Sequence, residues 1–258
     1  MGFSTRQIDI LKLVRAEGFA AVEDLSARFS VTPQTIRRDI NALCDSGLLR
    51  RRHGGAGLPS NYENTTFESR EVMQAEGKRR IARAVARLIP DRASLFIGIG
   101  TTTAEVARAL LDHDGLRVIT NNLGVAELMC GNSSFEVILG GGKARNRDRD
   151  FIGETAMSVF RDIRADFGIV GVGAIDGDGS LRDFDFDEVR LSRLIVDNSR
   201  QTVVAADHTK FDRNATVRFA SLDEARALVT DAPVPPAIER VAARSGVTIH
   251  IAREAGHD

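Results

Sequence analysis

Apolar residues recur at every third or fourth position in the first part of the chain, a spacing that predicts amphipathic helices. Ile8, Leu11 and Val14 set this period in the first helix, and Gly18 follows it as a stop. Ala21 supplies no side-chain oxygen to cap the second helix, so packing must hold that helix in place. The three helices are expected over residues 5–17, 22–29 and 33 to about 45.

The third helix has clear boundary signals and a polar outer face. Thr32 is a suitable N-cap, and Pro33 suits the first helical position because its missing N–H would be unpaired there anyway. Ile36, Ile40 and Leu43 recur at intervals of four and three and are expected to face the core. The residues turned towards solvent are then Gln34, Thr35, Arg37, Arg38 and Asn41.

Residues 48–56 continue from this helix as an apolar start, a run of basic residues and a glycine turn. Two short helices joined by a tight turn and followed by a basic hairpin have the geometry of a winged helix-turn-helix. Arginine and glutamine can bond to base edges in the major groove, and a basic wing lies along phosphates. Solvated surface charge is the alternative interpretation of the same arginines. The wing residues expected to contact DNA are Arg51, Arg52 and His53.

The charge distribution supports a nucleic-acid partner although the whole chain does not. The 258 residues carry a formal net charge of −1, which by itself argues against such a partner. Residues 1–58, however, contain nine basic and six acidic residues, and five of the nine basic residues lie between positions 37 and 52. We therefore expect a winged helix-turn-helix domain over 1–57, a linker over 58–75 and a larger domain over 76–258.

Apolar runs alternate with helical patterns through the second part of the chain. This alternation predicts an α/β domain with a largely parallel sheet, whose ligands gather at the carboxyl ends of the strands. A long amphipathic helix over 67–89 is expected to connect the two domains. The predicted strands are 94–99, 116–120, 135–140, 166–172, 202–206 and 247–251, and the predicted helices are 102–111, 123–130, 153–161, 185–197 and 235–245.

A Gly-Thr-Thr-Thr turn follows the first predicted strand of this domain and opens a helix. Backbone N–H groups, hydroxyl groups and the positive helix end converge there, as a phosphate requires. The segment lacks the third glycine of a dinucleotide fingerprint and the Gly-Lys-Ser/Thr of a Walker loop. Threonines that cap an ordinary helix are the alternative. The residues of the turn are Gly100, Thr101, Thr102 and Thr103.

Three further predicted strands end in polar or glycine-rich loops, as loops around one pocket should. Asn121 follows the second strand, Gly141 and Gly142 follow the third, and Asp207 and Lys210 follow a later one. The Lys210 ammonium is expected to pair with a phosphate or with a hydroxyl-bearing carbon chain. A lone lysine after a strand is more often a surface charge, but the coincidence of four such loops favours an effector site.

Several classes of site and location are not expected. No apolar run approaches the length of a membrane span, and residues 1–6 lack the core of a signal peptide, so we expect a cytoplasmic protein. Cys44 and Cys130 are interpreted as small core residues. The five histidines lack metal-ligand spacing, and residues 176–180 depart from a calcium loop. No metal, cofactor or catalytic residue is assigned.

The segment from Ser30 to Leu43, together with residues 52–56, resembles the winged helix of DeoR-type bacterial repressors. The second half of that family is similar to sugar-phosphate isomerases, and its Gly-Thr turn and Asp-x-x-Lys-Phe motif bind phosphorylated effectors. Segments such as 120–123, 166–169 and 230–233 resemble the branch that controls glycerol 3-phosphate genes. The resemblance implies a repressor that binds double-stranded operator DNA as a homo-oligomer and is released by glycerol 3-phosphate.

Other functions fit the same motifs. The protein could repress another sugar-phosphate pathway, or activate transcription from a differently placed operator. It could also be a sugar-phosphate isomerase that carries a DNA-binding appendage, with Asp207, Lys210 or Glu188 as acid or base. The residues give no independent sign of a catalytic base placed on a substrate carbon.

Overall fold

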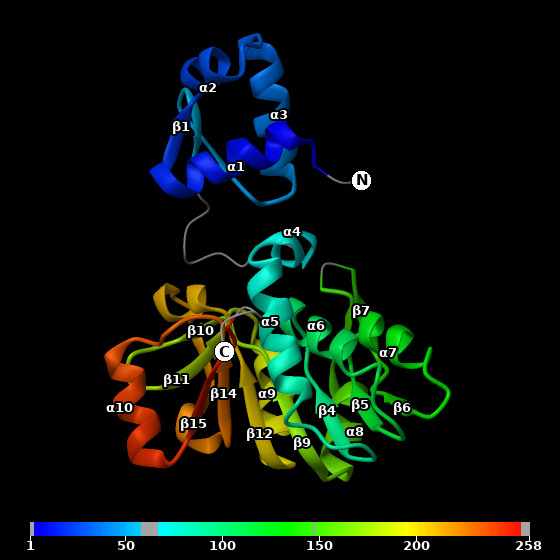
Figure 1. The fold of residues 1–258 in the computed structure, drawn as a ribbon. Helices are drawn as coiled ribbons and strands as arrows, with labels where there is room; N and C mark the ends of the chain where they lie inside the picture. Colours follow the sequence, from blue (N-terminus) through cyan, green and yellow to red (C-terminus); the bar gives the residue numbers. More distant parts are fainter. Residues whose placement is uncertain (1–2, 58–66, 147, 254–258) are drawn as a thin grey trace. The chain divides into compact units, whose positions relative to one another are not determined.

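The computed structural model describes residues 3–57, 67–146 and 148–253 and divides the chain into two compact units, Met1–Val72 and Met73–Asp258 (Figure 1). Each unit has buried apolar residues of its own, so each is described separately. The division falls within the linker expected over 58–75, of which residues 58–66 lie outside the described residues.

The N-terminal unit contains the three helices predicted from the sequence. Ser4 caps the first helix reciprocally with Gln7, and Gly18 ends it in the left-handed conformation. As predicted, Thr32 caps the third helix, whereas Ala21 makes no side-chain cap bond to the second. The helices are α1 (Thr5–Glu17), α2 (Val22–Phe29) and α3 (Pro33–Asp45).

A small antiparallel sheet completes this unit, and the sequence analysis missed one of its strands. The order is β1-β3-β2, with β1 (Phe19–Ala21), β2 (Arg50–Arg52) and β3 (Gly55–Gly57). Three residues are too few to show a period of two, and β1 exists only because distant β3 pairs with it. The two strands approach so closely that a Cβ on Gly55 would lie 2.1 Å from the Ala20 carbonyl oxygen.

The C-terminal unit is built on a seven-stranded parallel sheet of order β15-β14-β12-β9-β4-β5-β6. Six strands confirm the prediction, whereas β14 is missing from it. A buried parallel strand of four residues shows no alternation that the sequence could reveal. In chain order the strands are β4 (Ser94–Ile97), β5 (Arg117–Thr120), β6 (Glu136–Leu139), β9 (Ala165–Val170), β12 (Ser199–Ala205), β14 (Ala227–Thr230) and β15 (Thr248–Ile251).

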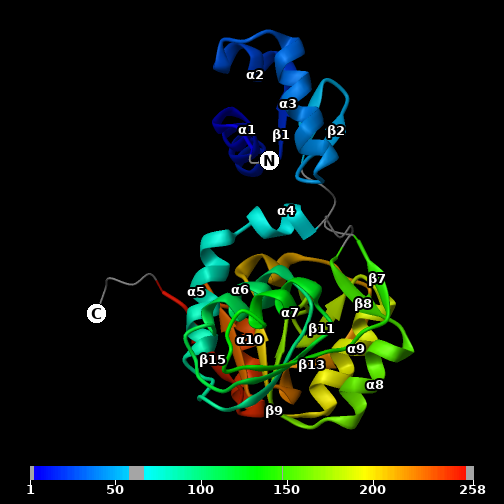
Figure 2. The same cartoon turned by 90° about the vertical axis from the view of Figure 1, so that its right-hand side faces the viewer.

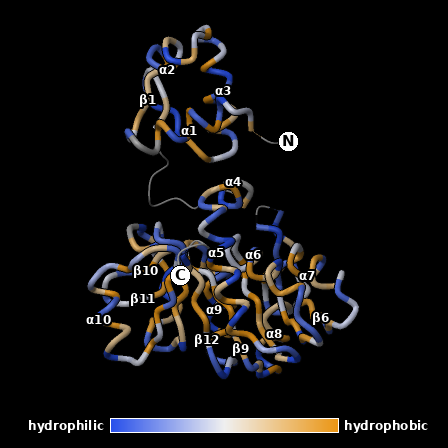
Figure 3. The backbone as a smooth tube through the Cα atoms, viewed as in Figure 1, coloured by the Kyte–Doolittle hydropathy of each residue, from blue (hydrophilic) through white to orange (hydrophobic). Residues whose placement is uncertain are grey.

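Helices cover both faces of this sheet, which confirms the predicted α/β class. Leu95 and Ile97 pack with the cluster of α5, α6 and α7, whereas Phe96 points to the other face and stacks on Phe160 of α8. Figure 2 shows α5 on one side and α8 and α9 on the other, and Figure 3 shows that apolar residues are frequent along the strands of the sheet. These helices are α5 (Ala75–Ala86), α6 (Thr101–Ala109), α7 (Leu123–Met129), α8 (Glu154–Asp162), α9 (Phe186–Asp197) and α10 (Pro236–Ser245).

The single helix predicted over 67–89 is wrong in one respect: the segment forms two helices. These are α4 (Phe67–Val72) and α5, and the chain breaks between them at Gln74, whose φ of 52° is left-handed. The residues around the break include neither proline nor a turn dipeptide, so the sequence carries no local signal for it. Cys130, predicted as a core residue, is exposed at the end of α7.

Two small antiparallel sheets lie outside the main sheet and were not predicted. The turn over 176–180 joins two of their strands, and Gly179 N–H donates to the Asp176 carbonyl at 2.8 Å. The strands are β7 (Lys143–Arg145) with β8 (Asp150–Ile152), and β10 (Ala174–Ile175) with β11 (Ser180–Asp183) and β13 (Val217–Ser221); the short helices are η1 (His208–Asp212) and η2 (Leu222–Glu224).

Candidate functional site

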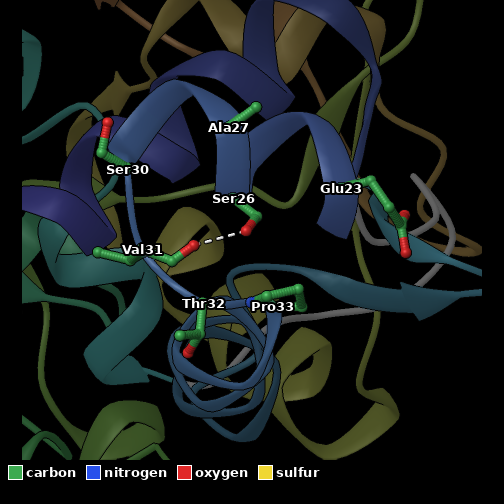
Figure 4. Close-up of a pocket in the computed structure, with 7 residues that line it drawn as sticks. All are labelled: Glu23, Ser26, Ala27, Ser30, Val31, Thr32 and Pro33. Carbon is green, nitrogen blue, oxygen red and sulfur yellow. Dashed lines mark hydrogen bonds between the residues drawn. The ribbon is translucent and has the colours of Figure 1, made fainter.

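The turn between α2 and α3 is held by short local hydrogen bonds. Ser26 Oγ donates to the Val31 carbonyl at 2.5 Å (Figure 4). Thr32 Oγ1 accepts from Thr35 N–H at 3.3 Å. Ser30 adopts a left-handed φ of 52° at the corner. An open hollow lies over this turn, lined by Glu23, Ser26, Ala27, Ser30, Val31, Thr32 and Pro33.

The outer face of α3 presents the polar residues that the sequence predicted. Ile36, Ile40 and Leu43 are buried, so the helix packs through the expected stripe. Gln34, Arg37 and Arg38 are exposed, whereas Thr35 and Asn41 are half-buried. Thr35 Oγ1 also bonds to Thr32 Oγ1 at 3.0 Å, which ties it to the helix cap.

One ion pair that the sequence analysis did not single out fixes α3 on α1. Arg6 Nε donates to Asp39 Oδ2 at 2.6 Å, and the Asp39 side chain is only 9% exposed. A buried carboxylate is costly unless it is paired, so this contact restricts how α3 sits on α1. Asp39 occupies the apolar side of the helix, and a charge among Ile36, Ile40 and Leu43 was the signal available in the sequence.

The wing presents its basic residues on two different faces. Arg51 pairs with Ala56, which is fully buried, whereas Arg52 pairs with Gly55 and leans over Gly57. Alternation along the strand therefore turns Arg51 away from Arg52. Burial raises the pKa of the Cys44 thiol on α3, and the charge of Arg51, together with a hydrogen bond from it, partly opposes that shift. His53 is exposed at the hairpin tip.

The four loops predicted to hold an effector lie at one edge of the main sheet. They follow β4, β5, β6 and β12, and because all strands are parallel their carboxyl ends share that edge. Strand β9 lies between β12 and β4, so the loop that follows it lies at the same edge. The sequence analysis did not include this loop. A Cβ on Gly171 in this loop would lie 3.4 Å from the Ile99 carbonyl oxygen and 3.6 Å from Thr103 Cγ2. The Gly-Val-Gly that follows β9 was the signal available in the sequence.

The Gly-Thr turn begins α6 as predicted. Gly100 has a φ of 128°, and Thr103 Oγ1 donates back to its carbonyl at 2.8 Å. Thr101 and Thr102 are buried. The first-turn N–H groups of a helix have no partner within the helix, so this turn can receive an anion.

The loops after β5 and β6 meet the hairpin of β7 and β8. Asn121 Nδ2 donates to the Phe151 carbonyl at 2.8 Å, whereas its buried Oδ1 has no partner among the described residues. Gly142 has a φ of 155°, and a Cβ there would lie 2.8 Å from the Ile152 carbonyl oxygen. A Cβ on Gly141 would meet no atom within 4 Å. The neighbouring Asn122 instead caps α7 by accepting from Val125 N–H at 3.1 Å.

Asp207 and Lys210 lie together after β12, and a second lysine joins them. Asp207 is 2% exposed and accepts from Thr209 N–H at 3.1 Å and from the Thr209 hydroxyl. Burial raises the Asp207 pKa, but the charges of Lys210 and Lys78 and the Thr209 bonds together hold it below its ordinary value. Lys78, on α5, was missed. It shares the apolar stripe of Ile81 and is itself 3% exposed.

The neighbouring carboxylate, Asp231, fastens the first turn of α5 to the same edge. It accepts from His208 N–H at 2.8 Å and lies 3.8 Å from Arg80 Nη2. A Cβ on Gly77 would lie 2.3 Å from Asp231 Oδ2, so only glycine allows this approach. The start of α5 is therefore positioned by the loops that follow β12 and β14.

A buried cluster of charges holds the hairpin of β7 and β8. Arg145 donates to Asp150, Asp185 and Glu188 at 2.6, 3.0 and 2.7 Å. Burial and the charge of Asp183 raise the Glu188 pKa to about 8, although Arg145 opposes the shift. Arg145 is thus an internal cation bound to carboxylates.

Within the parts of the chain that the structure describes, no three His, Cys, Asp or Glu side chains converge as metal ligands do. In the same parts, no helix has the length and apolar character that crossing a membrane requires.

Comparisons with known proteins agree on both units. The description "DeoR-like helix-turn-helix domain" matches residues 6–62, and "DeoR C terminal sensor domain" matches residues 73–232. The glycerol-3-phosphate regulon repressor of Escherichia coli (strain K12) is 48% identical over 92% of this chain and 94% of its own. The HTH-type transcriptional repressor CsqR of the same strain is 41% identical over 96% and 95%. Among solved structures, ribose 5 phosphate isomerase A from Neisseria gonorrhoeae is 17% identical, with a TM-score of 0.39 over 54% of each chain.

Proposed function

The chain belongs to the DeoR family of transcriptional repressors, and from this premise we propose that glycerol 3-phosphate releases it from its operator. The observation that carries the proposal is the 48% identity, over 92% of the chain, to the glycerol-3-phosphate regulon repressor of Escherichia coli. Double-stranded operator DNA in the cytoplasm is then the macromolecular partner.

On the DNA side, α3 and the wing supply the contacts. Arg37, Arg38 and Gln34 are exposed on the helix that follows the turn, and such side chains read base edges in the major groove. Asn41 and Thr35, whose side chains are shorter, add further polar contacts to the DNA. Arg51, Arg52 and His53 bind the phosphates beside the groove.

On the effector side, the carboxyl edge of the sheet receives the phosphate. The first-turn N–H groups and hydroxyls from Gly100 to Thr103 favour a dianion, and Lys210 adds charge pairing. The unpartnered Asn121 Oδ1 is available to accept from an effector hydroxyl. The open Gly141 and the left-handed Gly142 allow close approach of the loop backbone.

The effector weakens DNA binding only if effector and DNA prefer different states of the protein. By linkage their antagonism is reciprocal, typically about 1–3 kcal/mol. The effector therefore binds more weakly when operator is present, by the same factor as it weakens operator binding.

An isomerase with a DNA-binding appendage is the competing hypothesis. Glu188 is the observation in its favour, because a carboxyl group with a pKa of about 8 suits proton transfer near neutral pH. Arg145 already binds that carboxylate at 2.7 Å, and the relatives compared above are repressors. We therefore expect no conversion of ribose 5-phosphate by the purified protein.

Titration on the upstream DNA of its own gene tests the proposal. Glycerol 3-phosphate should lower operator affinity, whereas glycerol and inorganic phosphate at equal concentration should act far more weakly. Lys210→Ala should bind operator normally and resist release at glycerol 3-phosphate concentrations that release the wild-type protein. Operator binding that is insensitive to glycerol 3-phosphate would discard this effector, and release by ribose 5-phosphate alone would assign the protein to another pathway.

A further inference from the structure

Lysine is rare in this chain, and three of its four lysines lie on segments at one edge of the main sheet. Only four of the 35 basic residues are lysines. Lys12 lies on α1, whereas Lys78, Lys143 and Lys210 lie on segments at the carboxyl edge of the main sheet. An ammonium group is a compact point charge with three donors, whereas a guanidinium is a larger planar fork. Lys78 and Lys210 therefore bring two compact cations to this edge, where Arg80 also lies.

Helix α5 brings Lys78 to the middle of this edge. The helix leads into β4 at the amino edge, so its first turn lies at the carboxyl edge. There Gly77 packs on Asp231 and Arg80 pairs with the same carboxylate. Ile81 and its neighbours on α5 share an apolar cluster with Val106 of α6, the helix that the Gly-Thr turn begins. Lys78 is thus placed between that turn and the loop of Asp207.

The charges around Lys78 favour an anion. Lys78 is 3% exposed, and burying an ammonium group is costly unless negative charge accompanies it. Asp207 has Lys78 and Lys210 beside it, and these three groups together carry one net positive charge. The same edge contains buried polar atoms without partners among the described residues, Asn121 Oδ1 and Thr230 Oγ1, as expected where a polar ligand binds.

We propose that Lys78 binds the anionic group of the effector together with Lys210 and thereby couples effector binding to α5. The inference rests on the proposed function, since it names a further residue of that site. Unit 1 ends at Val72 and α5 begins at Ala75, so the turn that carries Lys78 is the first helical turn of the sensor unit. Gln74, whose backbone is left-handed, immediately precedes that turn and forms the joint between α4 and α5. A shift of Lys78 would therefore move this joint first.

Calorimetry without DNA tests the binding contact in full-length protein. Lys78→Met should weaken glycerol 3-phosphate binding about 10- to 100-fold, the loss expected for one charge-assisted hydrogen bond. Lys78→Arg should not restore the affinity, because the guanidinium is too large for a site built around an ammonium. Arg79→Met is the matched control, since Arg79 is the next residue on α5 and is exposed; it should bind like wild type. Unchanged operator affinity without effector shows that each variant is folded.

Operator titration at saturating effector tests the coupling. Lys210→Met should still be released once its weaker site is filled, whereas Lys78→Met should remain bound to operator. Wild-type effector affinity in Lys78→Met would overturn the contact, and full release of Lys78→Met at saturation would overturn the coupling.

Binding of inorganic phosphate separates this inference from the identity of the proposed effector. If wild type binds phosphate but not glycerol 3-phosphate, the effector is wrong, and loss of phosphate binding in Lys78→Met still supports the contact. If wild type binds neither, both proposals fall.

Discussion

At the scale of single residues, Glu188 shows how burial makes a carboxyl group sensitive to neutral pH. Its pKa of about 8 lies above the ordinary value of 4.5, so the folded protein holds a proton that the unfolded chain releases. The stabilisation is complete below the unfolded value and is lost as the pH rises through the folded value. Between about pH 5 and 8 the wild-type protein should therefore lose stability, by roughly 1–3 kcal/mol.

Thermal or urea unfolding at several pH values checks this expectation. The side chain in Glu188→Gln is neutral at every pH, so this variant should show a smaller decrease in the free energy of unfolding as the pH rises. Glu154→Gln, at an exposed ion pair on α8, should show the same pH dependence as the wild type. If the stability of the wild type depends on pH no more than that of Glu188→Gln, Arg145 keeps the Glu188 carboxylate ionised.

Asp39 is the second residue whose environment decides its role. Asp39→Ala should destabilise the N-terminal unit by about 1–2 kcal/mol, because it leaves Arg6 unpaired and frees α3 from α1. Operator affinity should decrease as well. Asp9→Ala is the control: its exposed pair with Lys12 should contribute less than about 0.5 kcal/mol. Equal losses of stability in Asp39→Ala and Asp9→Ala would show that the buried pair of Asp39 has no special role.

At the scale of elements, α3 and the wing should affect DNA binding in different ways. Arg37→Ala or Arg38→Ala should cost about 1–3 kcal/mol where the arginine contacts a base, and should relax the preference at that position. Arg52→Ala should reduce the salt dependence by about one counterion with little change in sequence preference. Arg51→Ala should have the smaller effect, since Arg51 lies on the other face, against Cys44. Anisotropy titrations at several salt concentrations measure both quantities, and wild-type binding by both α3 variants would contradict the assignment.

At the scale of the whole molecule, we expect a homo-oligomer on a partly palindromic operator. One helix-turn-helix contacts few base pairs, so specific repression generally requires two half-sites a helical turn, or a multiple of it, apart. Sedimentation should give a dimer or tetramer, and footprinting should protect paired half-sites. A monomer that protects a single half-site with high affinity would exclude this arrangement.

The sequence alone determined the features that are local or periodic. Apolar stripes identified α1, α2 and α3, because a helix forms its hydrogen bonds within one segment, and the Thr32 cap marked the start of α3. Runs of apolar residues identified six of the seven parallel strands and hence the edge at which their loops gather. The family motifs then identified a DeoR-type repressor, which the comparisons confirm.

Only the tertiary structure decided what depends on residues far apart in the chain. Strand β1 forms because β3 pairs with it, and β14 lies between β12 and β15. The sequence analysis did not single out Lys78, and packing places it beside Asp207, more than a hundred residues later. Arg145 likewise becomes an internal cation only when α9 brings Glu188 to it. Charge and burial are properties of the surroundings of a residue, and distant segments supply those surroundings only once the chain has folded.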